Sequence, residues 1–153
     1  MVFIEDIVIA YKGTFKPQNP SKYKGNPATI IYRSLWERKF MIYCDTNPNV
    51  LEWSSEELAV PYINPFDNRV HRYFVDFWVK LQEKDGSVSC KLIEIKPDKQ
   101  TKKPAERKKV NKAYLNEVQT FAINTSKWKA AEEYCKKNGW QFLILTEKHL
   151  FRK

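Results

Sequence analysis

The amino-acid sequence predicts a single α/β domain in which a mixed sheet carries flanking helices. Its 153 residues suit one domain with a modest core. Segments with strand-like patterns lie between segments with helical spacing, in the order α-β-β-β-α-α-β. Hydrophobic residues make up 42% of the chain and aromatic residues 14%, which excludes a chain that is disordered throughout.

The segment before the first predicted helix shows neither helical nor strand-like spacing. Residues 11–28 are rich in Lys, Pro, Asn and Gly, so we expect an extended basic arm that buries no core. The predicted organisation is an arm over residues 1–28 and one folded domain over residues 29–153.

The predicted helix and strands of the first half follow from hydrophobic spacing. Apolar residues recur at intervals of three and four over residues 29–46, which predicts a helix. A short strand over 58–62 is followed by two denser strands, over 73–81 and 87–95. Between these two lies Glu83-Lys84-Asp85-Gly86, a turn sequence typical of a hairpin.

The second half predicts two helices, a strand and a short terminal helix. Apolar residues from Tyr114 to Ala122 share one helical face, and Asn124 or Thr125 is expected to end that helix. A second helix is predicted over residues 126–137, ended by Asn138-Gly139. A strand over 140–145 and a short helix after Thr146 complete the chain.

The charge of the chain points to a polyanionic partner. The chain has 27 Lys and Arg residues against 18 Asp and Glu residues, a net charge of +9 with a pI near 9.4. Nucleic acid is the commonest such partner, although a solvated lysine-rich surface has the same composition. Cys44, Cys90 and Cys135 lack zinc-site spacing and are expected to be reduced thiols. We expect no membrane span and no signal peptide.

Two acidic residues stand inside strands that are otherwise apolar. If the hairpin turn centres on Asp85, Asp76 lies nine residues before the centre and Glu94 nine after it. Antiparallel pairing would set the two nearly opposite, with Cβ atoms about 5 Å apart. A divalent metal ion, Mg²⁺ or Mn²⁺, relieves the repulsion of two such carboxylates. Lys96 shares a strand face with Glu94 and would act on phosphate charge. An ordinary salt bridge is the alternative.

These residues resemble the signature of a nuclease superfamily. Val75-Asp76 followed by Glu94-Ile95-Lys96 is similar to the PD-(D/E)xK motif of restriction-endonuclease-like proteins, with Val75 in place of the Pro. Arg33-Ser34-Leu35-Trp36-Glu37 is similar to the R-S-x-x-E motif of Holliday-junction resolvases and of the endonuclease subunit of heteromeric transposases. The resemblance implies that Asp76, Glu94, the Ile95 carbonyl and Glu37 bind Mg²⁺, for which Mn²⁺ substitutes. It implies Glu37, Asp76, Glu94 and Lys96 as the catalytic set.

A longer resemblance covers nearly all of the chain after residue 10. Asn124-Thr125-Ser126-Lys127-Trp128-Lys129-Ala130-Ala131 is its most specific string, and Trp53-Ser54-Ser55-Glu56 and Ile93-Glu94-Ile95-Lys96-Pro97 belong to it as well. The chain resembles the head completion protein family of T-even-like tailed bacteriophages. This implies a nuclease-fold protein that acts on the end of packaged DNA late in head assembly. The implied location is the host cytoplasm or the virion, with portal or other head completion proteins as partners.

Basic residues follow the predicted catalytic strand directly. From Lys96 to Lys112 the chain has eight Lys or Arg residues, opposed only by Asp98 and Glu106. Double-stranded DNA would run there to reach the metal ion. The predicted phosphate contacts are Lys99, Lys102, Lys103, Arg107 and Lys108, together with Arg33 and Arg72. Tyr11, Phe15 and Tyr23 of the arm could stack on bases, or the arm could dock on a portal or capsid protein.

Two functions of different class fit these observations. The first is a metal-dependent DNA endonuclease, a phosphodiester hydrolase acting on packaged viral DNA ends. The second is a non-catalytic protein that binds DNA ends and plugs the head. The presence of Asp76, Glu94, Lys96 and Glu37 together favours the first. A structure-specific endonuclease similar to Holliday-junction resolvases is a third possibility.

Overall fold

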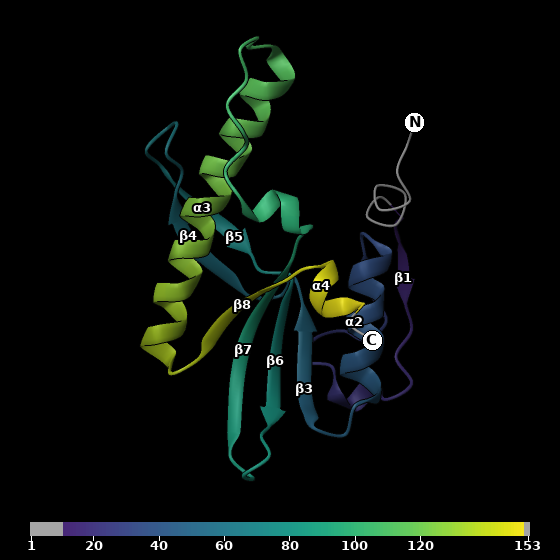
Figure 1. Ribbon diagram of the computed structural model, residues 1–153. Helices are drawn as coiled ribbons and strands as arrows, with labels where there is room; N and C mark the ends of the chain where they lie inside the picture. The colour runs from purple at the N-terminus through teal and green to yellow at the C-terminus, as the bar shows by residue number, and fades with distance from the viewer. Residues whose placement is uncertain (1–10, 152–153) are drawn as a thin grey trace.

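The computed structural model describes residues 11–151 and is built on a four-stranded mixed sheet (Figure 1). The strand order is β3 (Val50–Ser55), β6 (Phe77–Gln82), β7 (Val88–Ile95) and β8 (Gln141–Leu145). β6 pairs antiparallel with β3 and with β7, whereas β7 and β8 are parallel. The predicted α/β class with a mixed sheet is therefore confirmed. β3 was not predicted from the sequence.

The hairpin of β6 and β7 has the predicted register. Its pairs run from Phe77 with Ile93 to Gln82 with Val88. The Glu83 N–H donates to the Ser87 carbonyl at 2.7 Å. Gly86 adopts a left-handed φ of 87°, a conformation that glycine adopts without steric cost.

The single strand predicted over residues 73–81 is wrong, because the chain changes sheets in its middle. β4 (Ala59–Ile63) and β5 (Val70–Phe74) form a separate antiparallel ribbon that packs beside α3 (Lys112–Asn138). The chain leaves this ribbon at Phe74 and enters the central sheet at Phe77. The two residues between the strands, Val75 and Asp76, therefore lie at a junction rather than within a strand.

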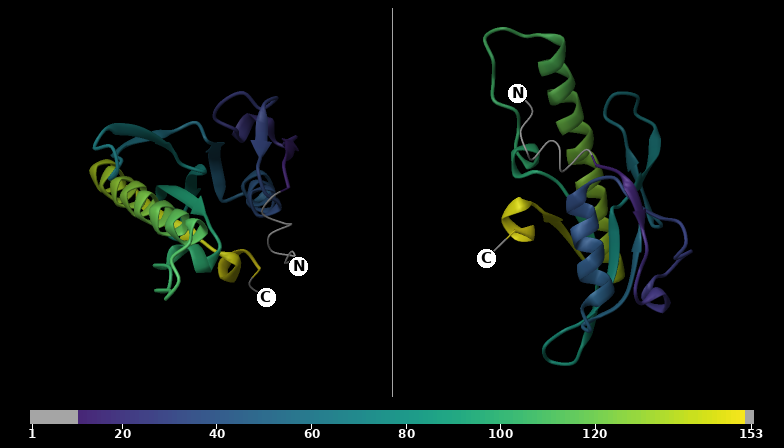
Figure 2. Two further views of the ribbon diagram at one scale, coloured as in Figure 1. Left: turned by 90° about the horizontal axis from the view of Figure 1, so that it is seen from above. Right: turned by 90° about the vertical axis from the view of Figure 1, so that its right-hand side faces the viewer.

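Helices cover the central sheet on two sides (Figures 1 and 2). α2 (Leu35–Thr46) packs with Phe77, Val79 and Ile93 in one core cluster. Trp128, Ala131 and Cys135 of α3 pack with Leu92 in a second cluster. Neighbouring strand residues thus point to opposite faces, as the period of two requires.

The helix predicted over residues 29–46 starts later than expected. Residues Ile30–Tyr32 form β2, which pairs antiparallel with β1 (Gly13–Phe15). Ser34 caps α2, because its hydroxyl accepts from the Glu37 N–H at 3.1 Å. The helix ends at Thr46, and Asn47 is its C-cap.

Residues 11–28 take part in the core, contrary to the prediction of an arm that buries nothing. Phe15 and Tyr23 are buried, and their rings lie 5.9 and 4.8 Å from the ring of Trp53. η1 (Pro20–Lys22) lies between them. Burial of Phe15 and Tyr23 excludes the base stacking predicted for them, whereas Tyr11 is exposed.

The two helices predicted after residue 112 form one continuous helix, α3. The expected break at Asn124 or Thr125 is wrong, because the Thr125 hydroxyl donates to the Phe121 carbonyl within the helix at 2.8 Å. Gly139, with a φ of 70°, ends the helix as predicted. The first half of α3 extends past the central sheet (Figure 1). The predicted last strand and the short α4 (Glu147–Leu150) are confirmed.

We expect Asp45→Ala to unfold at a lower urea concentration. The buried Asp45 carboxylate accepts from the backbone N–H groups of Gln18 and Asn19 at 2.7 and 2.9 Å. Removing it leaves both N–H groups without this acceptor, which lowers the free energy of unfolding by about 3 kcal/mol. Asp45→Asn retains one acceptor oxygen and should be destabilised less. Equal urea midpoints for the wild type and Asp45→Ala would contradict this prediction.

Candidate active site

The junction between β5 and β6 places Asp76 opposite Glu94. Phe77 pairs with Ile93, so one further step of the same register brings Asp76 to Glu94, as the symmetric spacing about Asp85 predicted. The Ile95 N–H donates to Asp76 Oδ2 at 2.8 Å, which fixes the carboxylate at the end of β7.

Glu94 is buried, and each of its carboxylate oxygens has a partner. The Tyr73 hydroxyl donates a short hydrogen bond to Oε2. Lys96 Nζ lies 3.8 Å from Oε1, and 28% of the Lys96 side chain is exposed. Lys96 directly follows β7, and its side chain lies on the side of Glu94, as predicted, with its ammonium toward that carboxylate.

Without a cation between them, the surroundings of Asp76 and Glu94 disfavour the charged forms of their carboxylates. Burial raises the pKa of Asp76 well above its ordinary value, and the nearby charges of Glu94 and Glu37 raise it further. Burial also raises the pKa of Glu94, although the Tyr73 hydrogen bond, Lys96 and Lys127 act in the opposite direction. A cation between Asp76 and Glu94 would offset both effects, and their hard oxygen donors suit Mg²⁺ or Mn²⁺.

Glu37 lies in the first turn of α2, on the side of Asp76. The Ser34 hydroxyl donates to Glu37 Oε2 at 3.3 Å, and burial raises the pKa of Glu37. Over residues 11–151, no three His, Cys, Asp or Glu side chains gather closely enough to form a ready metal site. The carboxylates of Asp76 and Glu94 are thus the pair that could hold a metal ion, and contacts from Glu37 and the Ile95 carbonyl stay predictions.

An ion pair borders the site on the side of β3. Arg33 forms two hydrogen bonds with the Glu56 carboxylate, at 2.9 and 3.1 Å. Glu56 adopts a left-handed φ of 53° and donates its N–H to the Asp76 carbonyl at 3.1 Å. The guanidinium of Arg33, a predicted phosphate contact, is thus held near Asp76. Arg72, a second such candidate, lies over the Phe74 ring at 5.4 Å.

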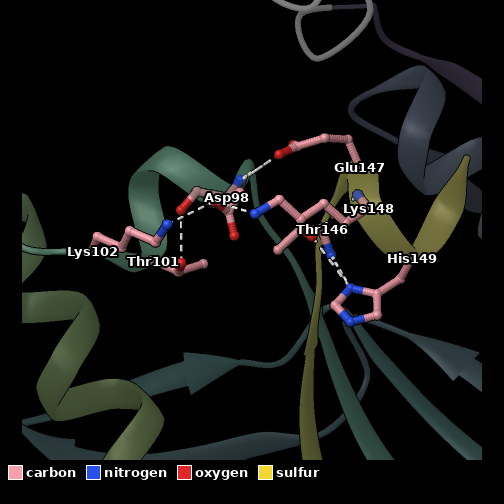
Figure 3. A network of polar contacts seen from close by, with 7 residues as sticks. All are labelled: Asp98, Thr101, Lys102, Thr146, Glu147, Lys148 and His149. Carbon is pink, nitrogen blue, oxygen red and sulfur yellow. Dashed lines mark hydrogen bonds and ion pairs between the residues drawn. The ribbon is translucent and has the colours of Figure 1, made fainter.

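The beginning of the basic loop is held beside the end of β7 by Asp98 (Figure 3). The Asp98 carboxylate pairs with Lys102 and Lys148, each at 3.1 Å, and the Asp98 N–H donates to Glu147. The Thr101 hydroxyl donates to the Asp98 carbonyl at 2.7 Å. These contacts tie η2 (Asp98–Thr101) to α4.

The other predicted phosphate contacts of the loop lie on the protein surface. Arg107 pairs with Glu117 at 3.2 Å and lies over the Tyr114 ring. Lys99, Lys103 and Lys108 are exposed. The structure therefore leaves these cations within reach of solvent, and their contact with DNA stays a prediction.

Two residues beside the carboxylates were not predicted from the sequence. Tyr73 binds Glu94, and Lys127 of α3 lies 5.5 Å from the centre of the Tyr73 ring. Tyr73 precedes Asp76 by three residues in a strand-like segment, which gave no sign that its hydroxyl meets Glu94. Lys127 belongs to the specific string over 124–131, and only the packing of α3 brings it here.

Comparison with known proteins identifies the class of enzyme to which this fold and site belong. Residues 47–147 match the TnsA-like endonuclease N-terminal family, a span that includes Asp76, Glu94 and Lys96. The chain therefore belongs to the TnsA-like endonuclease family. It is also similar to the head completion nuclease of Enterobacteria phage T4, at 41% identity over 143 residues, 91% of this chain and 93% of the relative. No solved structure matches the chain.

These similarities confirm the predicted nuclease class and the restriction-endonuclease-like α/β fold. The family match begins after Glu37, which lies in the segment that only the phage relative covers. Within the described part of the chain, no helix has the length and apolar character needed to cross a membrane.

Proposed function

We propose that this protein is a metal-dependent DNA endonuclease that acts on the ends of packaged viral DNA during phage head completion. The observation that carries the proposal is the convergence of Asp76, Glu94 and Lys96 at one end of β7. Membership of an endonuclease family and 41% identity to a head completion nuclease support it.

Each residue of the site has its own expected role in phosphodiester hydrolysis. Asp76 and Glu94, with the Ile95 carbonyl, would hold Mg²⁺, for which Mn²⁺ would substitute. The bound ion supplies Lewis-acid polarisation of the phosphate and a more acidic bound water. Lys96 stabilises charge that grows on the phosphate or orients the attacking water. Glu37 would contact the metal ion or a water bound to it.

The expected substrate is double-stranded DNA whose backbone runs along the basic loop. Portal and other head completion proteins are the expected protein partners, and the host cytoplasm and the virion are the expected locations. A phosphate backbone reaching the carboxylates from the loop would pass Lys99, Lys102 and Lys103.

Incubation of the purified protein with supercoiled, linear and branched DNA tests the proposal. We expect cleavage in Mg²⁺ and none in EDTA. Cleavage restricted to branched DNA would replace the proposal with a resolvase-like activity. A protein that cuts no form of DNA in either Mg²⁺ or Mn²⁺ would favour a non-catalytic head plug.

Charge reversal in the basic loop should weaken DNA binding at every sequence. Replacing Lys102, Lys103 and Lys108 together by Glu should reduce the slope of log affinity against log salt by about 0.9 for each phosphate contact removed. The control variant replaces three exposed lysines outside the loop, on α3: Lys129, Lys136 and Lys137. Binding titrations at several salt concentrations measure both slopes, and an unchanged slope in the loop variant would contradict the assignment.

A further inference from the structure

A cavity of about 700 Å³ lies between the basic loop and the projecting half of α3. Figures 1 and 2 show the loop running alongside this part of the helix. The wall of the cavity contains cations from the loop and polar or aromatic side chains from both elements. They include Gln100, Lys102, Lys103, Arg107, Phe121 and Asn124.

Asn124 is a largely buried residue that lines the cavity, and its side-chain amide has no hydrogen-bond partner within residues 11–151. Only 8% of the residue is exposed. The amide atoms of Asn124 are not among the fully buried unpaired atoms of the described residues, so they remain accessible from the cavity. Thr125, the next residue, shows the usual arrangement, because its hydroxyl is satisfied by Phe121. The Asn124 amide therefore has donors and acceptors available to a ligand in the cavity.

The position of Asn124 connects the cavity to the candidate active site. Asn124 precedes Lys127 by three residues, which places both on the same side of α3. Lys127 lies over the ring of Tyr73, whose hydroxyl binds Glu94. On the other wall, the loop begins at η2, shortly after the strand that carries Glu94. A nucleic-acid strand that leaves the carboxylate pair can therefore continue into the cavity.

The size and chemistry of the cavity select its ligand. A cavity of about 700 Å³ has room for a few unpaired nucleotides, whereas a base-paired duplex would have to lie across its opening. A cationic groove with an aromatic wall is the usual arrangement for unpaired strands, whose phosphates meet Lys and Arg and whose bases stack. Lys102, Lys103 and Arg107 supply the cations and Phe121 the ring. The amides of Asn124 and Gln100 supply both donors and acceptors for a base edge.

We propose that this cavity binds an unpaired DNA strand next to the bond that is cut. The proposal rests on the proposed endonuclease function and deepens it. The preferred substrate is then DNA that carries single-stranded nucleotides beside the duplex, as at an overhanging or frayed end, rather than a blunt duplex.

Fluorescence anisotropy in Ca²⁺, with the full-length protein, compares a blunt duplex with the same duplex carrying a four-nucleotide overhang. We expect the wild type to bind the overhang duplex about tenfold more tightly, because an unpaired base can stack on the Phe121 ring and its phosphates can meet the cations of the cavity. Asn124→Leu should abolish most of this preference and keep its affinity for the blunt duplex. Asn138→Leu makes the same change at an exposed position on the same helix and should keep the preference.

Thermal unfolding separates weaker binding from a folding defect. Asn124→Leu removes no hydrogen bond of the described fold, so its midpoint should stay near that of the wild type. Gln100 lies on the opposite wall of the cavity, in η2. Gln100→Ala should therefore also reduce the overhang preference, and it leaves the sequence of α3 unchanged. Equal wild-type affinity for both duplexes, or an intact preference in Asn124→Leu and Gln100→Ala, would overturn the proposal.

The cleavage assay and the anisotropy assay together distinguish failure of the endonuclease proposal from failure of the cavity proposal. A protein that prefers the overhang but cuts no DNA would retain the cavity assignment and contradict the endonuclease function. A protein that cuts DNA in Mg²⁺ and binds both duplexes equally would retain the endonuclease function and contradict the cavity assignment.

Discussion

Asp76→Ala is expected to abolish Mn²⁺ binding and to cut DNA on the order of a thousandfold more slowly, since a metal ion contributes several kcal/mol to stabilisation of the transition state. The Asp76 carboxylate is fixed by the Ile95 N–H at 2.8 Å and faces Glu94, so its loss removes one of the two carboxylates expected to hold the metal ion. Titration calorimetry with Mn²⁺ measures the binding, and single-turnover cleavage measures the rate.

Two control variants separate the metal site from the fold. Asp76→Asn retains an acceptor for the Ile95 N–H and removes the charge, so it should fold as the wild type does and still bind Mn²⁺ poorly. Asp67→Ala removes an exposed carboxylate that pairs with His71, and its Mn²⁺ affinity should not change. Addition of Mn²⁺ should raise the thermal midpoint of the wild type and of Asp67→Ala only. Equal Mn²⁺ affinity in the wild type and Asp76→Ala would remove Asp76 from the metal site.

The features that sequence predicted well depend on local patterns. The turn at 83–86 contains Asp85 and Gly86, and the turn fixes the register of both strands that leave it. Once this register is fixed, the position of Asp76 opposite Glu94 follows. The position of the Lys96 side chain on the side of Glu94 follows as well, because side chains alternate along an extended segment and Lys96 is two residues after Glu94. The core of the candidate site could therefore be predicted from about 20 residues around one hairpin.

The features that sequence did not predict depend on distant partners. The aromatic and β-branched residues of 73–81 suit one long strand, and only pairing of Tyr73 with Val60 in another sheet divides it. Asn124 and Thr125 favour helix ends in isolation, yet the packing of Trp128 and Ala131 holds α3 continuous through them.

The contacts of Glu94 with Tyr73 and of Tyr73 with Lys127 have the same origin. Tyr73 comes from the two-stranded ribbon and Lys127 from the helix packed beside it, so no spacing along the chain brings either to Glu94. Phe15 and Tyr23 gave no helical or strand-like pattern, and the neighbouring Trp53 explains their burial. A short segment rich in Lys and Pro can thus contribute to a core through two aromatic rings.

Lys96→Ala should separate catalysis from DNA binding. The Lys96 ammonium lies 3.8 Å from Glu94 Oε1, beside the position where the phosphate must approach the carboxylate pair. There it acts mainly on charge that grows in the transition state, which lowers the barrier with little change in ground-state affinity. We expect the cleavage rate to fall on the order of a hundredfold. DNA affinity should fall much less, because the substitution removes one phosphate contact among many.

Single-turnover cleavage in Mg²⁺, paired with binding in Ca²⁺, measures the two effects of Lys96→Ala separately. Lys91→Ala is the matched control, since Lys91 lies on β7, the strand that Lys96 directly follows, and pairs with Glu83 at 3.7 Å. Its cleavage rate and affinity should both stay near those of the wild type. Because Lys96 also lowers the pKa values of Asp76 and Glu94, Mn²⁺ affinity of Lys96→Ala is measured by calorimetry as well. A slower rate with intact Mn²⁺ and DNA affinity assigns Lys96 to the chemical step, whereas a parallel fall in rate and DNA affinity assigns it to binding alone.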